Sequence, residues 1–251
     1  MQVSFTGRAA LVTGAAQGIG QAIASGLAAA GARVHVADLD AAGVERFASA
    51  TGMTPHVLDV SDRAAAHRAV ASVAGREGRI DILVNAAGGV CGQVGRPIEE
   101  VAEEDWHVIF RANVDGAFWL SQAAAPSMRA AGWGRIVNIA SGAGLRPSLT
   151  GIQAYTAAKH ALVGLTKQLS QDLARFGITA NAVAPGLVRS NPSTERQWQS
   201  YGPEGQQRIV EGIHTRRLGT AADIAAAALF LASEQAAWTT GQILSVDGGR
   251  S

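Results

Sequence analysis

The amino-acid sequence predicts an α/β fold in which seven parallel strands form one doubly wound sheet with helices on both faces. Two observations predict it: short apolar runs alternate with helical segments throughout, and the first run leads through glycines into an alanine-rich helix. Parallel strands covered on both faces are typically nearly continuous apolar runs. The predicted strands lie near residues 8–13, 33–37, 56–60, 80–85, 134–139, 178–183 and 243–246.

A chain of 251 residues is long enough for one large α/β domain with a well-buried core. No Pro/Gly/Ser-rich linker, composition shift or internal repeat divides it. We therefore predict a single domain over residues 1–251.

The first strand runs through Ala9–Thr13 and breaks at Gly14. Gly18 and Gly20 then open a helical stretch that Gly31 closes. Strand, glycine turn and helix in this order are the context of a dinucleotide fingerprint, in which the glycines let the main chain approach a pyrophosphate at the helix N-terminus. The domain is therefore predicted to be a Rossmann-type dinucleotide-binding domain.

The second strand ends at Asp38, 24 residues after Gly14. A carboxylate at this position can accept hydrogen bonds from both ribose hydroxyls and would repel a 2′-phosphate. No Arg or Lys lies in the glycine loop or directly after Asp38. These features favour NAD over NADP as the cofactor.

Tyr155 and Lys159 stand four residues apart, so on a helix both side chains lie on one face. A free tyrosine has a pKa near ~10, and a cation about 4–6 Å away favours the phenolate and lowers that pKa. Ser141, fourteen residues upstream, can hold the oxygen of an alcohol or carbonyl beside the phenol. The three residues predict a proton-transfer site.

The motifs together resemble the short-chain dehydrogenase/reductase family over nearly the whole chain. The resemblance rests on Thr13-Gly14-x-x-x-Gly18-x-Gly20, Asp59-Val60, Asn85-Ala86-Ala87-Gly88, Asn113, the Ser141, Tyr155 and Lys159 set, Asn181–Gly186 and Gly241–Gly249. It implies hydride transfer to or from a nicotinamide cofactor. It also implies that Asn113, Ser141, Tyr155 and Lys159 are catalytic, with Asn113 bending its helix and holding a water on the proton path.

The resemblance implies the cofactor site as well. Its residues are Gly14, Gln17, Gly18, Ile19, Gly20, Asp38, Asp59, Val60, Asn85, Ala86, Gly88, Tyr155, Lys159, Pro185, Gly186, Val188 and Ser190. The chain departs from the family pattern at two of them. Ala86 stands where a second asparagine is common, and Ser190 replaces the usual threonine that contacts the nicotinamide carboxamide, while keeping the hydroxyl.

The family's substrate pocket is walled by the loop after the catalytic serine, the segment after Pro185-Gly186, and a lid that corresponds here to about residues 191–217. The lid is polar, and arginines suit carboxylates because the guanidinium binds them in a bidentate way. The expected substrate-binding residues are Ser141, Arg146, Gln153, Tyr155, Arg189 and Trp198. They favour an anionic, sugar-like substrate, unless the arginines are solvated or pair with nearby glutamates.

The sequence thus predicts an NAD-dependent oxidoreductase that oxidises a secondary or hemiacetal hydroxyl of a small polar substrate, such as a sugar acid, sugar or polyol. Two alternatives are a 3-ketoacyl-thioester reductase and a non-catalytic dinucleotide-binding redox sensor. A sensor would be expected to lack Tyr155, Lys159 or Ser141, and all are present.

Composition narrows the partners. A net charge of +1 without a dense basic cluster argues against nucleic acid as a partner. The sequence contains no apolar run of about 18 residues, so neither a membrane span nor export is predicted. Cys91 is the single cysteine, which argues against a cysteine-rich metal site and fits a reducing cytoplasm. No metal is expected. The resemblance implies a homotetramer, with helices near 105–131 and 154–176 at its main interface.

Overall fold

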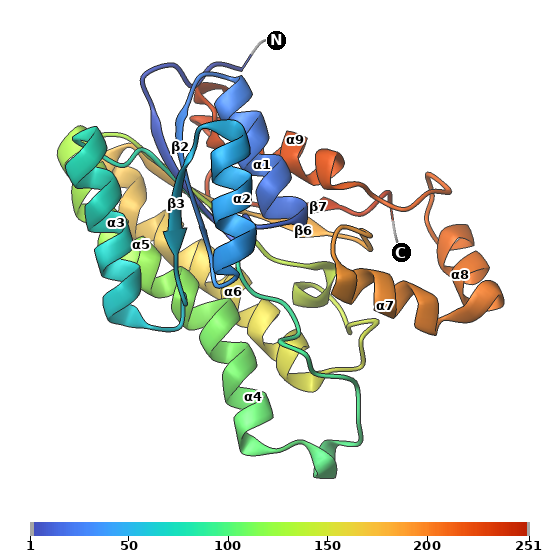
Figure 1. The fold of residues 1–251 in the computed structure, drawn as a ribbon. Coiled ribbons are helices and arrows are strands. Elements are labelled where there is room, and N and C mark those ends of the chain that lie inside the picture. The colour runs from blue at the N-terminus through green and yellow to red at the C-terminus, as the bar shows by residue number, and fades with distance from the viewer. Residues whose placement is uncertain (1–2, 250–251) are drawn as a thin grey trace.

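Seven parallel strands form one sheet in the computed structural model, which describes residues 3–249 (Figure 1). The strand order is β3-β2-β1-β4-β5-β6-β7. The strands are β1 (Ala9–Thr13), β2 (Arg33–Asp38), β3 (Thr54–Val57), β4 (Ile82–Asn85), β5 (Gly134–Ile139), β6 (Ile178–Pro185) and β7 (Ile243–Val246). The predicted doubly wound sheet is confirmed. Residues 1–2 and 250–251 of the predicted domain lie outside the described residues.

Helices cover both faces of the sheet (Figure 1). One face carries α1 (Gly18–Ala29), α2 (Ala41–Thr51) and α9 (Ala221–Ala232). The other carries α3 (Arg63–Glu77), α5 (Gly116–Ala131) and α6 (Gln153–Leu173). Short 3-10 turns are Ile98–Glu100, Gly142–Gly144, Ala174–Phe176 and Glu234–Ala236.

Strand β1 explains why the sheet has continuous apolar strands. Ala10 and Val12 pack towards α1, whereas Leu11 between them packs towards α3 and α5, and all three are fully buried. Successive side chains of a strand point to opposite faces, so a strand covered on both sides needs apolar residues at every position. Burying one Leu or Val side chain contributes about 1.5–3 kcal/mol.

The order of the strands reverses beside β1, which pairs with β2 on one side and with β4 on the other. In an open α/β sheet this reversal leaves a crevice at the carboxyl ends of the strands, where ligands bind. Thr13 and Asn85 end the two strands at this point. The site is therefore expected above them.

One predicted boundary was wrong. The third strand was expected over 56–60, but β3 ends at Val57, because its partner β2 ends at Asp38, which pairs with Val57. Leu58 and Val60 are buried in the loop that follows, so their apolar character signals burial rather than strand. The helix expected near 105–131 is divided into α4 (Glu103–Phe110), a π-helix (Arg111–Asp115) and α5.

Two helices, α7 (Pro192–Ser200) and α8 (Gly202–Glu211), project from the body of the domain beside the ends of β6 and β7 (Figure 1). They lie within the segment 191–217 that we call the lid. Between residues 3 and 249, no helix is both long and apolar enough to cross a membrane.

Candidate active site

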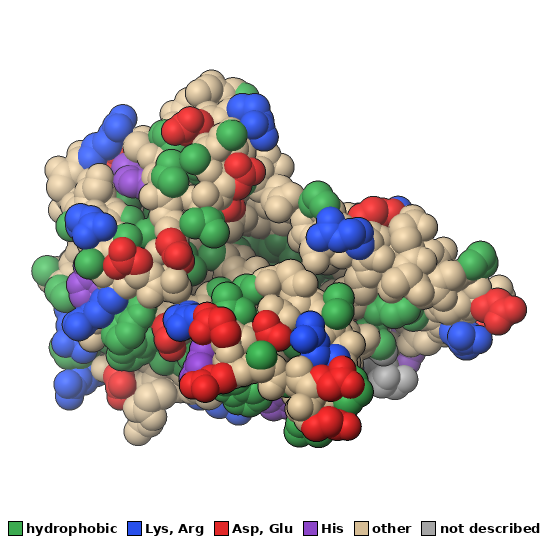
Figure 2. Space-filling view, turned by 60° about the horizontal axis from the view of Figure 1, so that its bottom comes forward, with side chains coloured by type: hydrophobic (Ala, Val, Ile, Leu, Met, Phe, Trp, Pro, Cys, Tyr) green, Lys and Arg blue, Asp and Glu red, His purple; other side chains and the backbone are tan. Residues whose placement is uncertain are grey.

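The carboxyl ends of the strands border one cleft of about 450 Å³. Its lining extends from Asp38 at the end of β2 to Gln197 in α7. The surface is hollowed between the body of the domain and the projecting lid (Figure 2). Segments that lie more than 150 residues apart in the sequence thus contribute to one site.

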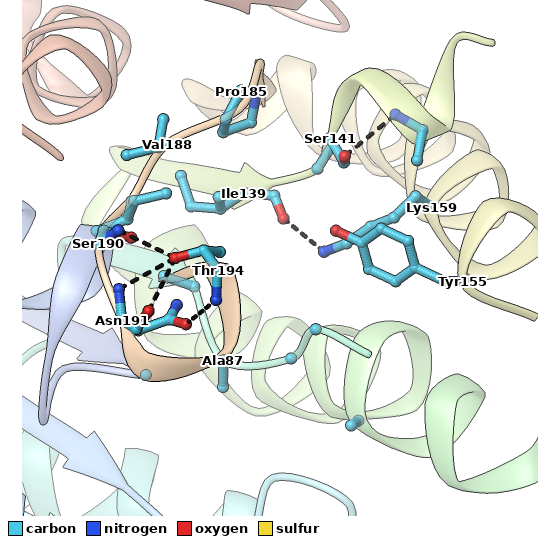
Figure 3. A pocket seen from close by; sticks show the side chains of 18 of the residues that line it. Ala87, Ile139, Ser141, Tyr155, Lys159, Pro185, Val188, Ser190, Asn191 and Thr194 are labelled. Atoms are coloured by element: carbon cyan, nitrogen blue, oxygen red, sulfur yellow. Dashed lines mark hydrogen bonds between the residues drawn. The ribbon is translucent and has the colours of Figure 1, made fainter. Parts of the chain in front are cut away.

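Tyr155 and Lys159 lie in the first two turns of α6 and point into this cleft from one helix face (Figure 3). The Lys159 Nζ lies 5.7 Å from the centroid of the Tyr155 ring. Lys159 is almost fully buried, and its Nζ donates a hydrogen bond to the main-chain oxygen of Ile139, at 2.9 Å. The last residue of β5 therefore holds the ammonium group beside the phenol.

Burial shifts both pKa values. Desolvation raises the pKa of Tyr155 above its usual value, and a hydrogen bond with Ser141 opposes that shift. Desolvation also lowers the pKa of Lys159 to about 8. The expected lowering of the phenol pKa by Lys159 is thus not the dominant effect in this structure, because removing water from the hydroxyl has the opposite sign.

Ser141 follows β5 and begins the turn Gly142–Gly144. Its Oγ accepts a hydrogen bond from the Ala143 main-chain N–H at 3.1 Å, which orients the hydroxyl towards Tyr155. Ser141, Tyr155 and Lys159, although 18 residues apart in sequence, thus meet at one end of the cleft.

Asn113 lies in the π-helix between α4 and α5 and is buried. Its Oδ1 accepts a hydrogen bond from Gly89 N–H at 2.9 Å, and its Nδ2 donates to the oxygens of Gly89 and Ile109, both at 2.8 Å. The side chain thus fixes the loop after β4. It does not line the cleft, although the adjacent Ala112 does.

The main chain of the glycine loop approaches other main-chain atoms closely. A Cβ on Gly20 would overlap the Gly14 oxygen, and a Cβ on Gly14, whose φ is +66°, would lie 2.7 Å from the Ala86 oxygen. Gln17, the N-cap residue of α1, makes no side-chain hydrogen bond to the helix. The N-terminus of α1 therefore offers main-chain donors and a positive dipole end at the cleft, which suits a pyrophosphate.

Asp38 is held at the other end of the cleft. Its Oδ2 accepts a hydrogen bond from Ala16 N–H and its Oδ1 accepts one from Asp40 N–H, both at 3.0 Å. These two bonds orient the carboxylate after β2. The Asp59 carboxylate lines the same end and accepts hydrogen bonds from Ser61.

Ser190 and the start of α7 form a compact hydrogen-bonded turn (Figure 3). The Thr194 hydroxyl accepts hydrogen bonds from the main-chain N–H groups of Ser190 and Asn191, at 3.1 and 3.2 Å. Asn191 in turn caps α7 through Thr194 N–H at 3.0 Å. The beginning of the lid is thereby joined to the segment after Pro185-Gly186.

Most of the residues expected to hold the cofactor line this one cleft. They are Gly14, Gln17, Ile19, Gly20, Asp38, Asp59, Val60, Ala86, Gly88, Tyr155, Lys159, Pro185, Gly186, Val188 and Ser190. Gly18 lies outside this lining, and a Cβ added there would lie 2.9 Å from the Ser190 oxygen. Asn85 is buried in β4, and its Nδ2 donates to Asn138 Oδ1 of β5 at 2.8 Å. The residues present thus fit a dinucleotide.

The expected substrate-binding residues are only partly brought together. Ser141, Arg146 and Tyr155 line the cleft. Outside its lining, Gln153 donates to the Arg96 main-chain oxygen, Arg189 pairs with Glu195, and Trp198 is buried against Arg189. Arg146 also has an acidic partner, since its Nη2 lies 2.6 Å from Asp247 Oδ2.

Several lining residues were not predicted from the sequence. Polar ones are Ser148, Thr150, Asn191, Thr194 and Gln197, and Cys91 is a further one. The loop after Ser141 and the lid were expected as walls, but no pattern indicated which of their side chains turn inward. Desolvation raises the pKa of the Cys91 thiol, so this group does not suit nucleophilic chemistry.

Comparisons with known proteins agree with this geometry. The family model described as enoyl-(acyl carrier protein) reductase matches residues 14–251. The chain is 40% identical to D-threitol dehydrogenase of Mycolicibacterium smegmatis over 250 residues, covering 97% of this chain and 92% of that protein. It is 36% identical to the 3-oxoacyl-[acyl-carrier-protein] reductase of Escherichia coli over 250 residues, covering 98% of both.

A solved structure is similar as well. The chain superimposes with a TM-score of 0.90 and 32% identity on a 7α-hydroxysteroid dehydrogenase complexed with NADH and 7-oxo glycochenodeoxycholic acid, covering 99% of this chain and 96% of that one. The sequence motifs, the sheet order and these matches agree. The chain belongs to the short-chain dehydrogenase/reductase family.

Proposed function

We propose that this oxidoreductase uses NAD to oxidise a secondary or hemiacetal hydroxyl of a small polar, sugar-like substrate, such as a polyol, a sugar or a sugar acid. The observation that carries the proposal is the cleft itself. Tyr155, Lys159 and Ser141 meet at one end of it, and the oriented carboxylate of Asp38 lies at the other.

The proposed roles follow from the contacts of each residue. Ser141 holds the substrate hydroxyl and Tyr155 takes its proton, and a bound nicotinamide would supply the acceptor for the hydride of the same carbon. Lys159 keeps a positive charge near the developing phenolate, and Ile139 holds that charge in place. Because the side chain of Asn113 is engaged by Gly89 and Ile109, a water on the proton path would bind the main chain of the π-helix.

NAD is proposed over NADP because of the charge beside the ribose site. Asp38 and Asp59 both line this end of the cleft, so it carries carboxylates where a 2′-phosphate would need a cation. The relation to a 7α-hydroxysteroid dehydrogenase complexed with NADH supports this choice.

A sugar-like substrate is proposed because hydroxyl and amide side chains border the substrate end of the cleft. Ser148, Thr150, Asn191 and Gln197 offer donors and acceptors to a polyhydroxylated molecule. The similarity to D-threitol dehydrogenase supports this class. A carboxylate on the substrate would have to be bound by Arg146, since Arg189 lies outside the lining and pairs with Glu195.

A 3-ketoacyl-thioester reductase is the second candidate. The similarity to the 3-oxoacyl-[acyl-carrier-protein] reductase and the description of the family model favour it. The acidic end of the cleft disfavours it, because a phosphorylated dinucleotide would meet Asp38 there. A redox sensor without catalysis is disfavoured by the complete set of Ser141, Tyr155 and Lys159.

A cofactor and substrate screen tests the proposal. Sugars, sugar acids, polyols and hydroxy acids are offered with NAD and with NADP, and the reduced cofactor is followed by absorbance. Acetoacetyl thioesters with NADH and NADPH form the reverse arm. We expect oxidation of a polyol, sugar or sugar acid with NAD; thioester reduction with NADPH as the only activity would replace the proposal by the second candidate.

We also propose a homotetramer in the cytoplasm. Trp106 of α4 and Phe118 of α5 are partly exposed on the helices expected at the interface, and burial of such side chains would stabilise an assembly. Light scattering coupled to gel filtration measures the mass directly, and a monomer would contradict this part of the proposal.

A further inference from the structure

Arg146 is the arginine whose position bears most directly on the choice of substrate. Its guanidinium Nη2 lies 2.6 Å from Oδ2 of Asp247, which follows strand β7. The Arg146 side chain is 32% exposed and that of Asp247 only 10%, so the ion pair is partly shielded from water. Such a pair is screened less than one on the open surface.

The ion pair lies where the ends of three neighbouring strands converge. The guanidinium covers the main chain of Gly142, because a Cβ added there would lie 3.5 Å from Arg146 Nη2 and 3.6 Å from the Pro185 oxygen. Gly186 packs on the Asp247 main chain, where an added Cβ would lie 2.8 Å from its Cα. The pair therefore joins the segments after β5, β6 and β7.

Asp247 continues this connection to the base of the lid. Its Oδ1 accepts a hydrogen bond from Gly249 N–H at 3.1 Å. In the same turn, the oxygen of Gly248 accepts one from Thr215 N–H at 3.1 Å. Thr215 belongs to the stretch through which the lid returns to the body of the domain. A line of contacts thus runs from the loop of Ser141 to the end of the lid.

The ion pair of Arg146 and Asp247 also affects the charge at the substrate end of the cleft. Among the described residues that line the cleft, the cations are Arg146 and Lys159. Lys159 serves the phenol and the Ile139 oxygen, and Arg146 faces Asp247. A carboxylate that approached Arg146 would come close to the carboxylate of Asp247, and like charges at such distances repel.

We infer that Arg146 and Asp247 form a positioning pair that holds the base of the lid against the loop of Ser141, and that the Asp247 carboxylate beside Arg146 makes this wall select a neutral polyol over the corresponding acid. The inference rests on the proposed function and narrows its substrate class. It assigns Arg146 to positioning, in place of the anion binding expected from the sequence.

The kinetic test uses D-threitol and D-threonate, which differ by an alcohol against a carboxylate at one end. The wild type, Arg146→Gln, Asp247→Asn and the double variant are assayed with NAD. We expect the wild type to prefer threitol, and Asp247→Asn to raise the threonate-to-threitol ratio of kcat/KM at least tenfold, because it removes the carboxylate that repels the acid. Arg146→Gln should lower kcat for both substrates by similar factors.

The opposite pattern would overturn the inference. If Arg146→Gln lowers kcat/KM for threonate alone, and Asp247→Asn leaves the ratio unchanged, Arg146 binds the substrate's carboxylate. The matched control is the ion pair Arg96–Asp105, which lies outside the cleft at 3.3 Å. Its variants Arg96→Gln and Asp105→Asn should leave the substrate ratio as it is in the wild type.

A second measurement needs no substrate and keeps the inference separate from the proposed function. Melting temperatures of the two single variants and the double variant form a double-mutant cycle, and we expect the double variant to melt no lower than the less stable single one. Trypsin should also cut the lid, which contains Arg196 and Arg208, faster in Arg146→Gln. Additive losses with unchanged cleavage would refute the positioning pair, whereas failure to oxidise any compound of the cofactor and substrate screen would count against the proposed function alone.

Discussion

The ammonium group of Lys159 is bound to the main-chain oxygen of Ile139, 2.9 Å from Nζ. One residue lies on a helix and the other ends the strand beneath it, so this hydrogen bond ties α6 to the sheet two residues before Ser141. The proposed base Tyr155, its neighbouring cation and the Ser141 hydroxyl are therefore positioned by a single junction between β5 and α6.

Replacing the phenol hydroxyl tests the proton transfer directly. Tyr155→Phe should lower kcat about 10²–10⁴-fold, because general acid–base catalysis contributes that much, while NADH affinity stays nearly unchanged. Steady-state rates and a fluorescence titration measure the two quantities. Tyr201→Phe alters the other tyrosine of the chain, outside the cleft lining, and is the control. A Tyr155→Phe variant that kept more than about a tenth of the rate would exclude Tyr155 as the base.

Lys159 should give the unfolding free energy a distinct pH dependence. Its pKa is lowered to about 8 in the fold and returns to about 10.5 on unfolding, so the unfolded chain binds more protons between these values. The contribution of Lys159 to stability therefore rises from pH 8 to pH 10, by about 3 kcal/mol at most.

Lys159→Met removes this contribution. Melting temperatures of the wild type and the variant, measured without cofactor from pH 7 to pH 10, should differ most at pH 7, where the variant is relatively more stable. Lys167→Met, at an exposed position of the same helix, is the control and should follow the wild type. A constant difference between wild type and Lys159→Met would show that the ammonium group is not desolvated.

A histidine pair between β2 and β3 should make the fold sensitive to acid. Nδ1 of the buried His35 lies 2.9 Å from Nε2 of His56, and His35 Nε2 lies 3.1 Å from Glu77. Desolvation lowers the pKa of His35, and it lowers that of His56 to about 4. His56 is therefore neutral in the fold at pH 6.5, where a free histidine is half protonated, and His35 is less protonated there than a free histidine.

The contribution of this histidine pair to the free energy of unfolding is present above pH 6.5 and is lost as the pH falls towards 4. The reason is that the two histidines are protonated at a higher pH in the unfolded chain than in the fold. We expect a loss of about 1–2 kcal/mol between pH 7 and pH 5 in urea unfolding, and a smaller loss in His56→Gln. His107→Gln changes an exposed histidine and should behave as the wild type does. An identical acid response in His56→Gln would contradict the prediction.

Gly20 should tolerate no side chain. Because a Cβ at Gly20 would overlap the Gly14 oxygen, Gly20→Ala has to move α1 away from β1. We expect a stability loss of about 1–3 kcal/mol and at least tenfold weaker NADH binding, measured by unfolding and by titration. At Gly75 in α3 a Cβ meets open space, so Gly75→Ala should stabilise the protein by about 0.5–1 kcal/mol. Equal effects of both variants would mean that the close approach of Gly20 is unimportant.

The succession of strands along the chain and the location of the glycine loop could be predicted because they depend on patterns that are local in the sequence. The apolar run of β1, its break at Gly14 and the acid at Asp38 lie within 30 residues of one another. The end of β3 could not be predicted, since it depends on where the neighbouring strand β2 stops.

The substrate end was predicted less well for the same reason. Asp247, which pairs with Arg146, stands 101 residues later, in the turn after β7, and no local pattern connects the two residues. Arg189 finds Glu195 six residues on, a pairing that the sequence left as an open alternative. Chemistry carried by short motifs is therefore visible in the sequence, whereas the charge of a pocket depends on pairs formed only in the folded chain.

The pairing of β1 with β4 also has a consequence for how the protein is made. Ala10 of β1 lies opposite Ile82, so the central ladder cannot form until about 80 residues have been synthesised. The pyrophosphate loop and Asp38 belong to the segment that is synthesised first, whereas Ser141, Tyr155 and Lys159 are added later. A growing chain should thus acquire its nucleotide-binding half on the ribosome well before it can catalyse a reaction.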